Sequence, residues 1–375
     1  MRATTAWRAF SIPIAFMNTV AVSVVEAQAP PVVIRAEKVY TVTNGIFEPG
    51  EILLCGGKIC EIGSQVTVPP DAIVHEARVV IPGLIDAHAH VFAKVSGEFP
   101  RQVTDTTPAD REATAEQLLE RMAATGVEKA NLIQIGGQGV EHHRYLLRCL
   151  RTYPEHFRGI GLIADHQHPE EQMDRLAGDG GIIGFRLFDI GGPRDPLAPM
   201  DVRTFETYPV WRHAAEKDYV IWLYPQAAEN HCVPFLLQAF PEMTVVYNHL
   251  AFCPGDGTFG HDEAGRPQID LPIPPQTRYN TMGLHQYPNV CVMLSGQYAF
   301  SKEAYPYKDL SQWHGNLLRT FQADHLMWGT DSPWIVQDPG YDELVRVIDA
   351  QLPESKAQDR ALIMGGTAQA RLFSR

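Results

Sequence analysis

Eight short apolar runs recur between residues 79 and 331, and helical patterns lie between them. In the plainest of these patterns, residues 116–124, Leu118, Leu119 and Met122 fall on one helix face. Strands that alternate with helices in this way predict an α/β fold, the (β/α)8 TIM barrel. A doubly wound open sheet would share the alternation, but no GxGxxG or P-loop motif supports it. The expected strands are residues 79–87, 129–136, 158–164, 182–188, 219–225, 244–250, 290–296 and 325–331.

The segment before this repeat, residues 30–80, has a different pattern. It contains short β-prone runs that are interrupted by Gly56-Gly57 and by a turn-forming stretch at residues 68–71. We therefore expect a small antiparallel β appendage over residues 30–80, followed by the barrel over residues 81–375.

The six cysteines are scattered and contain no CxxC motif or paired zinc spacing. Cys55 and Cys60 are candidates for a bridge across a hairpin. Free, mostly buried thiols are the simpler expectation for the whole set, which comprises Cys55, Cys60, Cys149, Cys232, Cys253 and Cys291.

The first 29 residues resemble a secretory signal peptide. Arg2 and Arg8 precede an apolar run over residues 9–25, and Ala27-Gln28-Ala29 is a small-x-small cleavage sequence. We expect cleavage after Ala29, export to the periplasm or beyond, and no membrane span in the mature chain. The alternative is an uncleaved membrane anchor, which the short run and its internal Pro13 and Asn18 disfavour.

The chain is acidic, with a formal net charge of −13 at pH 7. An acidic surface argues against nucleic acid or an anionic membrane as a partner. It does not exclude an anionic small molecule, because one arginine in a pocket can override the net field. We expect a small-molecule substrate, and a homo-oligomer is compatible with the sequence.

Polar side chains end the predicted barrel strands. His88 and His90 follow the first apolar run at i, i+2 spacing, so they point the same way from an extended strand. Because active sites of parallel barrels lie at the carboxyl ends of the strands, the polar groups should share one mouth. The later strands contribute Gln134, Arg186, Tyr224, His249, Ser295 and Asp331.

These residue types suggest hydrolytic chemistry. Asp331 can accept a proton from water, and His88, His90 and His249 can stabilise an oxyanion directly or through a bound metal. The planar guanidinium group of Arg186 can form a bidentate pair with a carboxylate. We place Arg186, Tyr224, Gln134 and Ser295 in the substrate-binding set. The alternatives are an internal ion pair for Arg186, a core role for His249 and backbone capping for Ser295.

Two motifs give the chain a family resemblance. The stretch PGLIDAHAH (residues 82–90) resembles the first-strand metal motif of the amidohydrolase superfamily, and WGTDSP (residues 328–333) resembles its last-strand aspartate motif. Stretches around Gln134, Arg186 and His249 are similar to the amidohydrolase-related branch of lactonases and decarboxylases. The resemblance implies that His88, His90, His249 and Asp331 are catalytic or metal-binding, and that residues 30–80 are half of a β-sandwich.

The chain departs from the metal-dependent relatives at two positions. Tyr224 ends the fifth strand in place of a histidine, and the fourth strand carries Arg186 but no lysine ligand. These departures disfavour a binuclear centre. Two options remain open: catalysis without a metal, or a single Zn²⁺ held by His88, His90 and Asp331.

The leading hypothesis is a hydrolase that opens a lactone or related cyclic ester of a carboxylate-bearing small molecule. The alternatives are a metal-dependent non-oxidative decarboxylase, an amide hydrolase and a catalytically silent exported binding protein. The Gly- and Pro-rich segment at residues 254–279 is either a binding loop over the site or a surface excursion.

Overall fold

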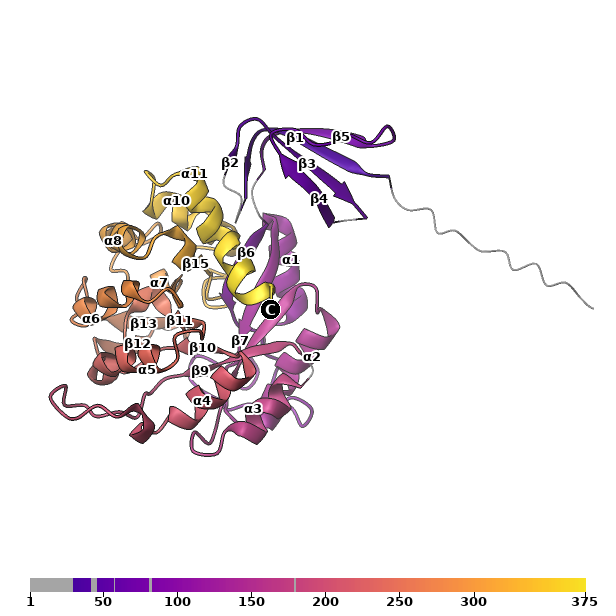
Figure 1. Ribbon diagram of the computed structural model, residues 1–375. Helices are drawn as coiled ribbons and strands as arrows, with labels where there is room; N and C mark the ends of the chain where they lie inside the picture. Colours follow the sequence, from indigo (N-terminus) through magenta and orange to yellow (C-terminus); the bar gives the residue numbers. More distant parts are fainter. Residues whose placement is uncertain (1–29, 42–45, 57, 81–82, 179) are drawn as a thin grey trace, which may run out of the picture.

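The computed structural model describes residues 30–41, 46–56, 58–80, 83–178 and 180–375. The predicted signal peptide, residues 1–29, lies outside them. Eight parallel strands form the predicted barrel sheet, and a separate small sheet precedes it (Figure 1). The barrel strands are β6 (Leu84–Ala89), β7 (Val127–Ile133), β8 (Phe157–Leu162), β9 (Ile182–Leu187), β10 (Val220–Leu223), β11 (Val245–Tyr247), β14 (Val290–Leu294) and β15 (Leu326–Trp328).

Neighbouring barrel strands follow the chain order from β6 to β15. The last and first strands meet beyond the end of β15. There the Asp331 amide donates to the His88 carbonyl at 2.8 Å, and the His90 amide donates to the Ser332 carbonyl at 2.8 Å. These bonds nearly close the sheet and bring the two motifs that suggested the family into direct contact.

Alternation along each strand divides the core into two layers. On β14, Cys291 and Met293 face the barrel interior, whereas Val292 and Leu294 pack outward with the helices. Leu372, in the C-terminal segment, joins the interior cluster. The helices are α1 (Ala115–Thr125), α2 (Arg144–Thr152), α3 (Glu170–Ala177), α4 (Tyr208–Lys217), α5 (Val233–Ala239), α6 (Arg278–Gly283), α7 (Gln297–Phe300), α8 (Ser311–Phe321), α9 (Tyr341–Leu344), α10 (Val347–Gln351) and α11 (Ala357–Ala361).

Helix α1 illustrates how local sequence sets an element. Thr114 and Gln117 form a reciprocal capping box at its start, and Gly126 takes a left-handed conformation (φ 75°) at its end. The predicted apolar face is confirmed, because Leu118 and Met122 are buried. Helix α1 therefore ends where the sequence supplies a residue that tolerates positive φ.

The appendage contains β1 (Val32–Tyr40), β2 (Ile46–Phe47), β3 (Gly50–Cys55), β4 (Lys58–Gly63) and β5 (Ile73–Val80). The predicted antiparallel pairing holds for β1 with β2 and β3, and for β3 with β4. Strand β5 differs, because it runs parallel to β1. The first expected barrel strand, residues 79–87, is consequently divided: its first two residues pair with β1, and β6 begins at Leu84.

The cysteines are all free thiols, including Cys55 and Cys60 of the β3–β4 hairpin. Residues 254–279 form an excursion that contains the antiparallel hairpin β12 (Thr258–His261) and β13 (Pro267–Asp270). Within the described part of the chain, none of the helices is long and apolar enough to cross a membrane.

Candidate active site

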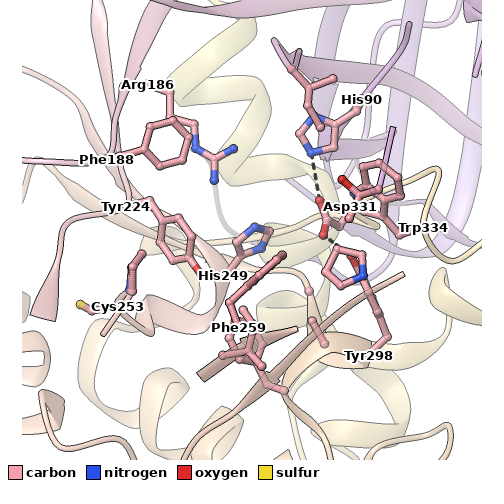
Figure 2. A pocket seen from close by; sticks show the side chains of 18 of the residues that line it. His90, Arg186, Phe188, Tyr224, His249, Cys253, Phe259, Tyr298, Asp331 and Trp334 are labelled. Atoms are coloured by element: carbon pink, nitrogen blue, oxygen red, sulfur yellow. Dashed lines mark hydrogen bonds and ion pairs between the residues drawn. The ribbon is translucent and has the colours of Figure 1, made fainter. Parts of the chain in front are cut away.

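A cavity of about 450 Å³ lies at the carboxyl ends of the barrel strands (Figure 2). Of the eight polar strand-end residues predicted from the sequence, six line this cavity and two do not. Gln134, Arg186, Tyr224, His249 and Asp331 line the cavity, as does His90, whereas Ser295 lies behind the wall. His88 is also fully buried beneath the lining. The β12–β13 hairpin adds Phe259 and Ile269 to the lining, which supports the binding-loop alternative for this segment.

Asp331 is the polar centre of the cavity. Its Oδ1 lies 3.1 Å from His90 Nε2 and 3.4 Å from His88 Nε2. Burial alone raises the pKa of this carboxyl, but the neighbouring histidines outweigh burial and hold its pKa well below the usual range. Asp331 also has positive φ (59°), a conformation that non-glycine residues adopt mainly where the fold or function requires it. The geometry thus presents an ionised carboxylate to the cavity.

His88 and His249 form a stacked pair next to this carboxylate. Their ring centroids are 4.7 Å apart and the ring planes differ by 22°. The Ser295 hydroxyl lies 3.1 Å from Nδ1 of His249 and 3.4 Å from Nδ1 of His88. Burial lowers the pKa of His249 to about 4 and lowers the pKa of His88 as well. Both rings are therefore neutral near pH 7, which leaves a nitrogen lone pair on each.

His90 has a fixed tautomer because its Nδ1–H donates to the Ile133 carbonyl at 2.8 Å. In a neutral ring, Nε2 then presents a lone pair to the Asp331 carboxylate at 3.1 Å. Two acceptors at this separation need a proton or a cation between them. His90 is thus poised to carry a proton toward Asp331 or to share a cation with it.

Arg186 lies on the opposite side of the cavity from Asp331 (Figure 2). Its guanidinium carbon stacks 4.5 Å from the Phe188 ring centroid and 5.3 Å from that of Tyr224. Burial lowers the pKa of Arg186 to about 10, so the group is still cationic at neutral pH. Within the described residues it makes no ion pair, and its buried Nε has no hydrogen-bond partner. This cation is available to an anionic ligand.

The other predicted substrate contacts have different surroundings. Tyr224 meets His249 edge to face, with ring centroids 5.3 Å apart, and burial raises the pKa of its phenol. The amide nitrogen of Gln134 donates to the carbonyls of Ile135 (2.8 Å) and His142 (3.0 Å). Tyr224 is free to meet a ligand, whereas Gln134 mainly fixes the loop after β7. Ser295 is placed to orient the two histidines.

Sequence reasoning missed two residues that hold the site together. The Tyr298 hydroxyl, on α7, donates to Oδ2 of Asp331 at 2.7 Å. Asp86 is fully buried and accepts hydrogen bonds from the Thr330 amide (2.9 Å), the Thr330 hydroxyl (2.6 Å) and the Tyr341 hydroxyl (3.0 Å). Asp86 lay within the first motif and could have been found as the acidic residue before the histidines. Tyr298 had no comparable signal.

The family model described as amidohydrolase matches residues 85–374, most of the chain. The chain belongs to the amidohydrolase family. No curated protein matches it. The match begins within the first of the two sequence motifs and extends beyond the second.

Solved structures share the barrel of this amidohydrolase. A protein from Acinetobacter baumannii, described as a probable 2-pyrone-4,6-dicarboxylic acid hydrolase with citric acid bound, is 19% identical with a TM-score of 0.58, covering 78% of this chain and 100% of its own. A zinc-bound amidohydrolase from Burkholderia multivorans is 20% identical with a TM-score of 0.58, covering 77% and 98%. A 2,6-dihydroxybenzoate decarboxylase from Rhizobium is 16% identical with a TM-score of 0.53, covering 78% and 99%. At these identities the likeness establishes the fold alone.

The donor set of this amidohydrolase fits a single divalent metal ion. One ligand atom from each of His88, His249 and Asp331 lies within 4.8 Å of the other two. Nitrogen and carboxylate oxygen donors suit Zn²⁺, and three protein ligands leave a position for water. His88 Nε2 is buried and has no hydrogen-bond partner within the described chain. The sequence had placed His90 in this set. The tightest grouping contains His249 instead, while His90 contacts Asp331.

The arrangement can combine three functions in one cavity. An ionised carboxylate stands ready to accept a proton, two neutral imidazoles offer lone pairs, and a buried guanidinium lies across from them. These groups come from β6, β9, β11 and β15, so the barrel alone brings them together. Perturbed titratable groups that converge on one cavity are typical of an active site.

Proposed function

We propose that this amidohydrolase hydrolyses a lactone, or a related cyclic ester, of a carboxylate-bearing small molecule. The observation that carries the proposal is the position of buried Arg186, which makes no ion pair within the described residues, across one cavity from ionised Asp331. A buried cation without a counter-ion is costly, so an anionic ligand that reaches Arg186 gains from completing the pair. The name of the Acinetobacter baumannii neighbour, which describes a cyclic ester with carboxylates, is consistent with this substrate class.

In the proposed reaction, Asp331 accepts a proton from water as the water oxygen bonds to the ester carbonyl carbon. The ring C–O bond then breaks, and the departing oxygen takes up the proton that Asp331 received. His90 Nε2, 3.1 Å from Oδ1, can share a proton with the carboxylate during these transfers. Arg186 holds the substrate carboxylate so that the carbonyl faces Asp331. A divalent metal held by His88, His249 and Asp331 would polarise the carbonyl oxygen.

The decisive variant is Asp331→Asn, which keeps the size of the side chain and removes its basicity. We expect kcat/KM for lactone hydrolysis to fall by roughly 10²–10⁴-fold, the range for loss of a general base. The assay is ring opening in H₂¹⁸O over a panel of aliphatic and aromatic lactones with and without a carboxylate. Asp324→Asn, an exposed carboxylate on the short helix before β15, is the matched control and should retain full activity.

Two results would contradict the proposal. One is hydrolysis in Asp331→Asn at the wild-type rate. The other is a wild-type protein that opens none of the lactones, while circular dichroism shows that it is folded.

Non-oxidative decarboxylation of an aromatic acid is the second candidate. It is favoured by the aromatic walls of the cavity, since Phe188 and Tyr224 flank Arg186. The same panel separates the two reactions by their products. A hydrolase yields a ring-opened hydroxy acid that contains ¹⁸O, whereas a decarboxylase releases CO₂ from the carboxylated aromatic members and leaves an organic product without ¹⁸O.

We further propose that the protein acts outside the cytoplasm, on the basis of the cleavage sequence Ala27-Gln28-Ala29. N-terminal sequencing of the protein from the periplasmic fraction should begin at Pro30. Recovery only from the cytosol with Met1 intact would contradict this location.

A further inference from the structure

The cavity lining, as far as the structure describes it, contains one permanent positive charge. Among the described residues that line it, Arg186 is the sole arginine, and no lysine contributes. The remaining wall is largely apolar or aromatic. It includes Ile135, Leu162, Phe188, Phe259, Ile269, Phe300 and Trp334.

Two further arginines that pack against aromatic rings of the lining are engaged elsewhere. Arg111 stacks behind Trp334, 4.8 Å from its ring centroid, and donates to the Thr106 carbonyl at 2.9 Å. Arg266 lies behind Tyr298 and pairs with Asp262 at 3.1 Å and with Asp338 at 2.8 Å. Each is separated from the cavity by an aromatic ring that lines it. Among the described side chains, a second carboxylate on a ligand would therefore have no cationic partner beside Arg186.

The two aromatic rings beside Arg186 also restrict how it binds. The Phe188 and Tyr224 ring centroids lie 4.5 Å and 5.3 Å from the guanidinium carbon and 6.4 Å from each other, so both rings flank the same side of the group. The N–H groups that point away from these rings are left for hydrogen bonds to a ligand. The in-plane edge of a guanidinium matches one carboxylate in a bidentate pair. Beyond that pair the ligand meets the apolar wall, where a charged group would lose its hydration without compensation.

We propose that the substrate is a monocarboxylate with an apolar, ring-sized body, and that the cavity discriminates against dicarboxylates. As a statement about turnover this rests on the proposed lactonase function, whereas the ligand preference depends on the cavity alone. The volume of about 450 Å³ is within the range of small-molecule sites and suits a body of one or two rings. This preference for monocarboxylates distinguishes the cavity from a site that binds a pyrone dicarboxylate.

The test uses three benzene derivatives of similar shape that cannot be hydrolysed as lactones: 3-methylbenzoate, isophthalate and 3-methylbenzamide. Their dissociation constants for the wild-type protein are measured by calorimetry, with and without added Zn²⁺. We expect 3-methylbenzoate to bind at least about tenfold more tightly than either of the others in both conditions, because only it pairs with Arg186 and leaves no second charge. Equal or tighter binding of isophthalate, or no binding of 3-methylbenzoate, would overturn the inference.

The variant Arg186→Gln tests whether Arg186 causes the preference for a monocarboxylate. In Arg186→Gln the affinity for 3-methylbenzoate should fall at least about tenfold, with that for 3-methylbenzamide unchanged. Arg148→Gln, which alters an exposed arginine on α2, should change neither value. Since these probes are not lactones, the binding order can hold even when lactone hydrolysis fails, and the two proposals fail separately. Unchanged 3-methylbenzoate affinity in Arg186→Gln would count against the inference.

Discussion

The Tyr298 hydroxyl donates a 2.7 Å hydrogen bond to Oδ2 of Asp331, while His90 Nε2 lies 3.1 Å from Oδ1. One carboxylate oxygen is therefore held by a hydrogen bond from α7, and the other faces the residue after β6, with which it can share a proton or a cation. A general base that is held by a donated hydrogen bond retains one orientation toward its water. This relationship makes Tyr298 a positioning residue for the proposed reaction.

The variant Tyr298→Phe removes the hydrogen bond and keeps the ring that lines the cavity. We expect kcat for lactone hydrolysis to fall by about 10–100-fold with little change in KM, because a misoriented carboxylate costs rate and leaves substrate binding intact. Steady-state kinetics measures the split between the two constants. Tyr279→Phe, at an exposed tyrosine, is the control and should match the wild type. A rise in KM at unchanged kcat would assign Tyr298 to substrate binding instead.

Kinetics of a Ser295 variant can distinguish a positioning role for this residue from a substrate-binding role. Its hydroxyl contacts His249 and His88 from behind the cavity wall, so it should act through the orientation of those rings. In Ser295→Ala we expect kcat to fall by about tenfold or more and KM to stay near the wild-type value. The substrate-contact role predicted from the sequence requires the opposite pattern, a raised KM. Comparing the two constants decides between these roles.

The strand ends could be predicted because each barrel strand is an apolar run that stops at a polar residue. Strands of a parallel barrel are buried on both faces, and their carboxyl ends share one mouth, so His88, His90, His249, Arg186 and Asp331 could be placed together from sequence alone. All eight expected strands exist, with most boundaries shifted by a few residues.

The sequence could not predict how deep each of these side chains lies within the barrel mouth. Strand periodicity gives the face of a residue, but His249 and Asp331 follow their strands with positive φ, 37° and 59°, which redirects their side chains. That turn places His249 beside His88 in the cluster for which His90 was expected. Ser295 is one residue beyond β14, and the same periodicity could not show that it lies behind the wall. Tyr298 lies on a four-residue helix whose placement depends on tertiary packing.

Metal binding can be tested through stability independently of catalysis. The donor atoms of His88, His249 and Asp331 are brought together by folding, so a metal that binds them stabilises the folded state. After dialysis against a chelator, Zn²⁺ at about 100 times its dissociation constant should stabilise the protein by about 2.7 kcal/mol. We expect a clear rise in Tm by differential scanning fluorimetry for the wild type.

His88→Ala and His168→Ala form the matched pair for this measurement. His88 contributes a buried donor, whereas the His168 side chain is 86% exposed. The Zn²⁺-dependent rise should disappear in His88→Ala and persist in His168→Ala. The same rise in His88→Ala would mean that zinc binds elsewhere on the protein.

Acid stability should depend on His143, which lies outside the catalytic cluster. Its Nδ1–H donates to the Gly139 carbonyl at 2.8 Å, and its Nε2 accepts from the Leu162 amide at 2.9 Å, so the folded protein requires the neutral ring. Burial lowers the pKa of His143 to about 4. In the unfolded chain the pKa is near 6.5, so its stabilising contribution is complete above that value and declines as pH falls toward 4.

The magnitude follows from this difference in pKa. Between pH 6.5 and pH 5 the unfolded state takes up a proton that folded His143 does not, which lowers the free energy of unfolding by about 2 kcal/mol. His143→Gln should therefore be less stable at pH 7 but should lose about 2 kcal/mol less on moving to pH 5. Urea denaturation at the two pH values measures the difference, with His168→Gln as an exposed control. Identical pH dependence in His143→Gln and the wild type would show that this ring does not govern acid sensitivity.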